Sequence, residues 1–318
     1  MGTDSGPKVA IVGAGYVGST AAYTIMLSGL ARRLVLVDVD RARAEGHALD
    51  LVHGSPLTAP VEVRAGGYED CRDADLVLFC AGAAQRPGQS RLDLVEQNLE
   101  VLRDSLPLLT ACPQAILLMV SNPVDVLTLA ALRLTGWSPS RVIGSGTVLD
   151  SARFRQALGH HFGVDPRNVH AYVVGEHGDT EVPLWSRATV AGFTVSEFEA
   201  LTGKHIGDRS AFFARVREAA QQVISRKGAT YYAIAVVLRR ILEAILNDEH
   251  SVLTVSGLVE GAYGLGDVCL SLPTIVGRRG REQVLALPLA AEELQALTES
   301  AALLTKFSEH RLPGSRHP

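Results

Sequence analysis

A glycine-rich turn near the start of the chain constrains the fold more than any other feature of the sequence. Its residues are Gly13-Ala14-Gly15-Tyr16-Val17-Gly18, and an apolar run at residues 9–12 directly precedes them. A helical pattern continues to about residue 28, and a second apolar run at residues 34–37 ends at Asp38. A strand, a tight turn, a helix and another strand make a βαβ unit, in which the two strands run parallel. The sequence therefore predicts an α/β fold built on a parallel sheet.

The same turn has the spacing of a nucleotide-binding loop. The pattern G-x-G-x-x-G alone is weak evidence in a chain with 30 glycines, where a cluster of packing or turn glycines is the alternative. Here a strand precedes it, a helix follows, and Asp38 lies 20 residues after Gly18 at the end of the next strand. Gly13 permits the tight turn, Gly15 admits a pyrophosphate, and Gly18 lets the helix pack closely on the strand. This context predicts dinucleotide binding.

The acidic residue selects between the two nicotinamide cofactors. Asp38 would accept hydrogen bonds from the ribose hydroxyls of NAD, whereas the 2′-phosphate of NADP would meet a carboxylate. We therefore expect NAD as the cofactor. The residues predicted to bind it in this region are Gly13, Gly15, Val17, Gly18 and Asp38.

The rest of the chain divides at about residue 146. Further apolar runs predict strands that complete a six-stranded, doubly wound sheet, at residues 61–64, 76–80, 116–120 and 142–143. Beyond residue 146 short strands mix with long helices, and Lys227-Gly228 predicts a break in the helical pattern of residues 212–246. We therefore expect a Rossmann NAD-binding domain at residues 1–145. An α+β domain at residues 146–318 would carry the substrate site, the catalytic residues and the oligomer contacts.

Composition and charge exclude several classes of protein. The formal net charge is −4 and the pI is near 6.2, so no global basic field would attract nucleic acid or an anionic membrane. The first residues lack a basic segment followed by an apolar run, and no run reaches membrane-spanning length, which favours a cytoplasmic protein. The cysteines fit neither a zinc site nor a disulfide framework, so we expect free thiols and no metal. They are Cys71, Cys80, Cys112 and Cys269.

A histidine flanked by glycines is the first candidate for catalysis. His177 lies in Gly175-Glu176-His177-Gly178-Asp179, directly after the apolar run at residues 171–174. The glycines let a ligand approach the backbone and the acids can set the charge of the ring, although a structural histidine fits the same pattern. Asp150 and Arg153 lie three residues apart at a predicted helix start and so share one face. From their spacing alone, they fit an ordinary ion pair equally well.

Six ordered motifs give the chain a resemblance to the NAD-dependent lactate/malate dehydrogenase family over nearly its whole length. Two are the glycine-rich turn and the histidine stretch. The others are residues 81–92 (AGAAQRPGQSRL), 121–125 (SNPVD), 144–154 (GSGTVLDSARF) and 227–230 (KGAT). The resemblance implies an enzyme that transfers a hydride between NADH and a 2-oxo acid.

The resemblance assigns roles to four charged residues. His177 would donate a proton to the carbonyl oxygen that hydride transfer makes negative, and Asp150 would contact and orient it. Arg153 would hold the substrate carboxylate in a bidentate grip, and Arg91 would reach the carbonyl from a loop that closes over the substrate. All four are present, whereas a dinucleotide-binding protein without activity should have lost at least one of them.

Gln85 bears on the choice of substrate. Malate dehydrogenases of the family carry arginine at this position to pair with a second carboxylate, and lactate dehydrogenases carry glutamine. A second carboxylate beside Gln85 would be buried without a charged partner, so the resemblance implies pyruvate and L-lactate as substrates. Arg86 keeps the malate alternative open, because a one-residue shift of the loop would present it instead. The spacing to Pro87-Gly88 argues against such a shift.

Three further site residues rest on the resemblance alone. Asn122 would form hydrogen bonds near the nicotinamide and the substrate, Thr230 would line the substrate pocket, and Ile234 would pack on the nicotinamide. Thr230 and Ile234 share a helix face at i,i+4 spacing, but a simple core contact has the same spacing.

Regulation and assembly complete the expectations. Arg155 and His170 match two positions that bind fructose 1,6-bisphosphate at a subunit interface in bacterial relatives, although ordinary surface pairing fits them too. The short segment before Val9 favours a tetramer of bacterial type, without the long N-terminal arm of vertebrate relatives. We therefore expect a homotetramer, with fructose 1,6-bisphosphate as a candidate effector.

Overall fold

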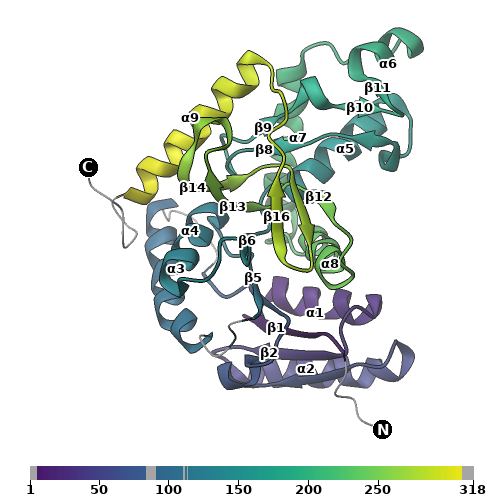
Figure 1. Cartoon of the computed structure of the whole chain (residues 1–318). Helices are drawn as coiled ribbons and strands as arrows, with labels where there is room; N and C mark the ends of the chain where they lie inside the picture. The colour runs from purple at the N-terminus through teal and green to yellow at the C-terminus, as the bar shows by residue number, and fades with distance from the viewer. Residues whose placement is uncertain (1–5, 84–90, 110–111, 113, 310–318) are drawn as a thin grey trace.

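The computed structural model has an eight-stranded sheet at the centre of the molecule (Figure 1). It describes residues 6–83, 91–109, 112 and 114–309. The strands of this sheet are β1 (Lys8–Val12), β2 (Arg33–Val37), β3 (Glu62–Ala65), β4 (Leu76–Phe79), β5 (Ile116–Met119), β6 (Val142–Gly144), β13 (Ser256–Glu260) and β14 (Gly266–Ser271). Their order across the sheet is β14-β13-β6-β5-β4-β1-β2-β3.

The first six strands form the parallel, doubly wound part of the sheet. β1 pairs in parallel with both β2 and β4, so Val9 lies opposite Leu34 on one side and Leu76 on the other. The strand order reverses between β1 and β4. In α/β sheets of this kind, ligands bind beyond the carboxyl ends of the strands at the point of reversal. The predicted Rossmann fold is confirmed.

Two strands from the second half extend the sheet beyond the six that the sequence predicts. β13 runs antiparallel to β6, where Ser256 lies opposite Gly144, and β14 runs antiparallel to β13. The sheet is therefore mixed, and it continues past the predicted boundary at residue 146. Apolar patterns locate strands without naming their partners, and this pairing joins segments that are distant in the sequence.

Helices cover both faces of the sheet, and each face has its own hydrophobic core. On one face lie α1 (Tyr16–Ser28), α2 (Arg41–Gly54) and α8 (Tyr232–Leu246), and on the other lie α3 (Arg91–Ser105), α4 (Val124–Thr135) and α9 (Ala291–Glu309). α8 belongs to the second half of the chain, yet its Leu238 shares a core cluster with Ile25 of α1 and Leu36 of β2. The second half thus completes the hydrophobic layer over the first.

The second half has the predicted α+β arrangement, with a separate aromatic core. Phe154, Trp185 and Phe213 meet there in edge-to-face ring contacts. α7 ends at Lys227, Gly228 follows with a left-handed φ of 85°, and α8 begins at Tyr232, so the predicted helix break is confirmed. The remaining elements are α5 (Val148–Phe162), α6 (Val195–Thr202), α7 (Arg209–Lys227), β7 (Val169–His170), β8 (Val173–Val174), β9 (Val182–Pro183), β10 (Thr189–Val190), β11 (Phe193–Thr194), β12 (Ser251–Leu253), β15 (Thr274–Gly277) and β16 (Gly280–Val284).

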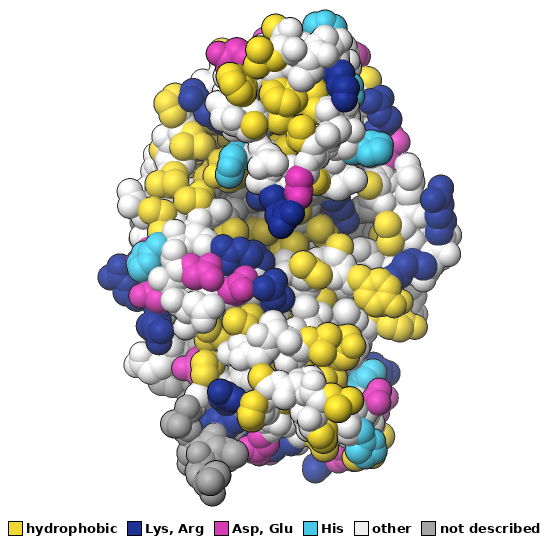
Figure 2. Space-filling view, turned by 90° about the vertical axis from the view of Figure 1, so that its right-hand side faces the viewer, with side chains coloured by type: hydrophobic (Ala, Val, Ile, Leu, Met, Phe, Trp, Pro, Cys, Tyr) yellow, Lys and Arg dark blue, Asp and Glu magenta, His cyan; other side chains and the backbone are white. Residues whose placement is uncertain are grey.

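The surface shows no segregation of charge on the face drawn in Figure 2. Positive and negative side chains are interspersed there, and hydrophobic side chains gather in a hollow across the middle of the molecule. Within the described residues, no helix is long and apolar enough to cross a membrane. All four cysteines lie in the described part of the chain and are free, as predicted, and three of them are buried.

Candidate active site

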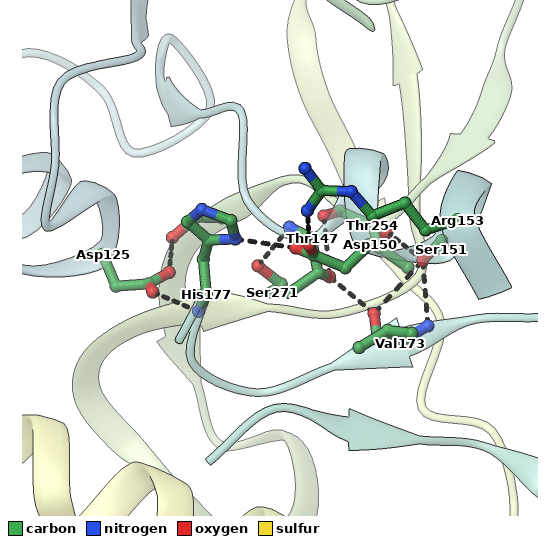
Figure 3. Close-up of polar contacts among 10 residues, drawn as sticks. Asp125, Thr147, Asp150, Ser151, Arg153, Val173, His177, Thr254 and Ser271 are labelled. Carbon is green, nitrogen blue, oxygen red and sulfur yellow. Dashed lines mark hydrogen bonds and ion pairs between the residues drawn. The ribbon is translucent and has the colours of Figure 1, made fainter. Parts of the chain in front are cut away.

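A buried carboxylate joins the two charged groups that the sequence proposes for catalysis and substrate binding (Figure 3). Asp150 lies in the first turn of α5, and His177 lies in the loop that follows β8. The Nδ1 atom of His177 is 2.7 Å from Oδ2 of Asp150. Arg153, one turn further along α5, donates from Nη1 to Oδ1 of Asp150 over 2.8 Å. The structure therefore brings these three predicted site residues together around one carboxylate.

The charge of Asp150 determines the protonation of His177. Burial alone would lower the pKa of His177, but the charge of Asp150 and the hydrogen bond to it outweigh burial and raise that pKa to about 9. Burial opposes ionisation of Asp150 as well, yet His177 and Arg153 hold its pKa below the usual range. At neutral pH the ring is a cation beside a carboxylate. Its side chain is 28% exposed, so a ligand can reach it.

A second buried aspartate, for which the sequence analysis predicts no role, holds the backbone of the loop that carries His177. Oδ2 of Asp125, in the first turn of α4, accepts a hydrogen bond of 2.7 Å from the backbone N–H of His177. Its Oδ1 accepts a bond of 2.6 Å from the hydroxyl of Ser256 on β13. The signals in the sequence are that Asp125 closes the motif SNPVD at residues 121–125 and stands among apolar residues at the start of α4.

Glu181 is a further acid in this region that the sequence analysis does not identify. Its carboxyl is only 8% exposed and comes directly before β9. Burial raises its pKa to about 8, the negative charge of Asp150 adds to this effect, and His177 opposes it. Burial therefore favours the neutral form of Glu181, whereas the neighbours of Asp150 favour its ionised form.

The glycine-rich loop has the shape that a dinucleotide needs. Gly13 has a φ of 96°, and a Cβ atom there would lie 2.5 Å from the backbone nitrogen of Ala81. A Cβ atom on Gly18 would overlap the carbonyl oxygen of Gly13. In contrast, the space around Gly15 is open, and α1 begins directly after it without a side-chain cap on its N–H groups. The turn thus leaves room and hydrogen-bond donors for a pyrophosphate.

Asp38, directly after β2, lies against the glycine-rich turn. Oδ2 of Asp38 accepts a hydrogen bond of 2.7 Å from the N–H of Ala14, which fixes the carboxylate against the turn. Val17 and Ile234 are both half-buried against the core cluster on this face of the sheet. These residues therefore fit NAD on one side of the sheet, beyond β1 and β2.

Of the remaining predicted site residues, Asn122 lies just beyond the end of β5. The backbone oxygen of Asn122, after β5, accepts a hydrogen bond of 2.7 Å from the side chain of Asn98. Asn98 also accepts one from the N–H of Ala83 after β4, which ties the two segments together. Thr230 is half-buried and lies before α8, so the prediction that it shares a helix face with Ile234 is wrong. Gln85 lies outside the described residues, and Arg91 begins α3 but its side chain lies outside the described part.

The two residues of the predicted effector site lie on neighbouring elements. Arg155 is on α5, and burial lowers the pKa of its guanidinium. Its Nε atom is buried and has no hydrogen-bond partner among the described residues. His170 is exposed at the end of β7, a strand that packs on α5. An unpaired buried donor is compatible with an anion, and the effector site stays a prediction.

Three potential metal ligands lie together elsewhere in the described structure, namely Asp248, His250 and Glu282. Glu282 pairs with Arg279 over 2.8 Å, and Asp248 accepts a hydrogen bond from the N–H of Arg278. These donors already occupy the carboxylates, and we assign no metal to this cluster.

Comparison with known proteins identifies the family. The model of the lactate/malate dehydrogenase NAD binding domain matches residues 7–144, and the model of the alpha/beta C-terminal domain of the same enzymes matches residues 147–312. The chain belongs to the lactate/malate dehydrogenase family. The first match covers the glycine-rich loop and Asp38, so NAD is the cofactor, as predicted.

Individual members of the lactate/malate dehydrogenase family are similar over almost their full length. The chain is 53% identical over 311 residues to the L-lactate dehydrogenase of Moorella thermoacetica. The matched region covers 96% of this chain and 98% of the relative. It is 50% identical over 303 residues to that of Acetivibrio thermocellus, covering 94% and 96%. The crystal structure of a minor L-lactate dehydrogenase from Enterococcus mundtii superposes with a TM-score of 0.93 at 40% identity, covering 96% and 99%.

Proposed function

We infer that the chain catalyses the NAD-dependent interconversion of pyruvate and L-lactate. The activity is that of the L-lactate dehydrogenases with which it shares about half of its residues. One observation carries the assignment to a particular site: Asp150 holds a cationic His177 through one oxygen and Arg153 through the other. A proton donor and an anion-binding group are therefore fixed side by side.

The residues of the site account for the chemistry of reduction. Bound NADH supplies the hydride that reaches the carbonyl carbon of pyruvate. His177 donates a proton from Nε2 to the carbonyl oxygen, and Asp150 stabilises the ring before and after the transfer. Arg153 binds the carboxylate of pyruvate through its remaining N–H groups, and Arg91 polarises the carbonyl. In the reverse direction the neutral ring of His177 accepts the hydroxyl proton of L-lactate.

The two halves of the chain divide this work. Residues 1–145 bind NAD, with Gly13, Gly15, Val17, Gly18 and Asp38 around the dinucleotide. Residues 146–318 supply His177, Asp150, Arg153 and the contacts between subunits, whereas Arg91 comes from the first half. Asn122, Thr230 and Ile234 lie between the two and contact the nicotinamide or the substrate.

The assay that tests this function compares two substrates. With Gln85 at the position that meets the substrate side chain, kcat/KM for pyruvate should exceed that for oxaloacetate by about a hundredfold or more, because a second carboxylate is buried without a partner. A higher kcat/KM for oxaloacetate would establish malate dehydrogenase activity instead. His177→Asn should bind NADH normally and lose about a thousandfold in kcat. Retention of turnover in this variant would contradict the proposed mechanism.

We also propose that the enzyme is a cytoplasmic homotetramer activated by fructose 1,6-bisphosphate. Arg155 and His170 from two subunits would form the anion site, and the buried, unpaired Nε of Arg155 supports this. The bisphosphate should lower the apparent KM for pyruvate and raise Tm. A titration that changes neither quantity would leave these residues with an ordinary surface role.

A further inference from the structure

Two side chains hold the loop of His177 through adjacent backbone amides. The backbone N–H of His177 donates to Oδ2 of Asp125 over 2.7 Å, and that of the preceding Glu176 donates to the hydroxyl of Ser300 over 2.9 Å. Asp125 comes from α4, in the cofactor-binding half, and Ser300 comes from α9. Both are almost fully buried, at 2% and 0% exposure. The two anchors therefore act on adjacent amides but connect the loop to two different helices, α4 and α9.

Asp125 is connected to the cofactor side of the site in a way that Ser300 is not. It lies three residues after Asn122, and α4 begins between them at Val124. Its second oxygen accepts the bond from Ser256, so the carboxylate is fixed from β13 as well. One side chain thus links the segment of Asn122, the loop of His177 and the antiparallel edge of the sheet.

We propose that Asp125 is a positioning residue for the reaction: by holding the amide of His177, it sets the place of the proton donor relative to the segment that carries Asn122. This inference rests on the proposed function, in which both residues face the same substrate. Hydride and proton reach adjacent atoms of one carbonyl group. The loop of His177 and the segment of Asn122 must therefore keep a fixed distance and orientation relative to each other. A misplacement of about 1 Å at a reacting centre costs about a hundredfold in rate.

The chemistry of the contact suggests the variants that separate geometry from charge. Asn at this position can still accept the N–H of His177 through its oxygen and donate to Ser256 through its amide nitrogen. Ala leaves both partners without the bond. The matched control is Ser300→Ala, which removes one side-chain anchor from the neighbouring amide and leaves the link to α4 intact.

The experiment measures pyruvate kinetics, NADH affinity, Tm and the isotope effect on kcat with 4-deuterated NADH for Asp125→Ala, Asp125→Asn and Ser300→Ala. For Asp125→Ala we expect kcat to fall about a hundredfold, NADH Kd to change by less than about twofold, and hydride transfer to become rate-limiting with a larger isotope effect. Asp125→Asn should recover kcat to within about fivefold of the parent. Ser300→Ala should lower Tm but reduce kcat by less than about threefold.

Two results would overturn the proposal. One is a loss of kcat in Ser300→Ala equal to that in Asp125→Ala, and the other is an Asp125→Asn enzyme as slow as Asp125→Ala. If Asp125→Ala does not fold, Ser256→Ala loosens the same carboxylate and should show the same isotope effect at a smaller loss of kcat. If the parent enzyme prefers another 2-oxo acid, the proposed substrate fails, and the comparison among the variants is made with that acid.

Discussion

One carboxylate, that of Asp150, holds both the proposed proton donor His177 and the proposed anion-binding group Arg153. Both of these groups affect the ionisation of Asp150. His177 and Arg153 keep Asp150 charged although it is buried, and Asp150 in turn keeps His177 protonated. In the proposed mechanism, a single buried acid therefore prepares the site for an anionic 2-oxo acid before any substrate binds. Removal of its charge should affect the pH dependence of the enzyme before it affects the fold.

The pH profile of activity follows from the pKa of His177, which rises from 6.5 to about 9. Pyruvate reduction needs the protonated ring, so kcat/KM for pyruvate should be level at neutral pH and fall as pH rises through about 9. For L-lactate it should rise over the same range. Protonation of His177 also stabilises the folded state, fully below pH 6.5, and this contribution is lost as pH rises through about 9.

A charge-neutral variant identifies the group responsible. Asp150→Asn should shift the alkaline limb for pyruvate to lower pH, because the main cause of the raised pKa is gone. Asp165→Asn is the matched control: Asp165 is exposed and pairs with Arg167, so the limb should stay in place. If the pH at which kcat/KM for pyruvate falls is unchanged in Asp150→Asn, the titrating group is not His177 but another residue.

Residue spacing predicts part of this site and not the rest. Asp150 and Arg153 lie one helical turn apart, so their shared face follows from the sequence, and the family motifs add His177. Asp125 meets His177 and Ser256 across separations of 52 and 131 residues, which only the tertiary fold brings together. Its role therefore could not be read from local pattern.

At the scale of elements, different glycines of the glycine-rich turn are needed for folding and for cofactor binding. A side chain on Gly18 would overlap the backbone of Gly13, whereas the space around Gly15 is empty and its backbone is extended. Gly15→Ala should leave Tm of the cofactor-free protein unchanged within about 1 °C and raise the NADH Kd by about tenfold or more. Gly18→Ala should raise the NADH Kd and also lower the Tm of the cofactor-free protein.

Thermal unfolding without cofactor and NADH fluorescence titration measure the two effects. Gly46→Ala in α2 is the control, because Gly46 also has open space around it but lies on an exposed face of α2 and not in the turn. It should leave NADH binding unchanged. Normal NADH affinity in Gly15→Ala would contradict a pyrophosphate against this residue.

The sequence predicts the positions of helices and strands better than it predicts which strands pair with one another. The alternation of apolar runs and helical patterns gives the six parallel strands and the break at Gly228, because both depend on neighbouring residues. The antiparallel addition of β13 and β14 depends on which edge of the sheet is open, and β13 meets β6 only at Ser256 and Gly144. Sheet membership of this kind is a property of the completed fold.

At the scale of the molecule, the shared core predicts cooperative unfolding. α8 covers the face of the sheet above α1, and β13 extends its edge, so neither half keeps its hydrophobic surface buried without the other. Calorimetry of the cofactor-free enzyme should show one transition, and NADH should shift all of it to higher temperature. Two transitions, with only one sensitive to NADH, would indicate independent domains. A fragment of residues 1–145 should not form a soluble fold.

The position of α8 also limits how such a protein can be recombined. The first and second halves correspond to separate stretches of coding sequence, and their boundary near residue 145 looks convenient for exchange between relatives. A chimaera joined there would pair α1 from one parent with α8 from another, across a core that must fit side chain by side chain. Inherited variation on these two helices is therefore expected to change together, and functional crossovers should keep them from the same parent.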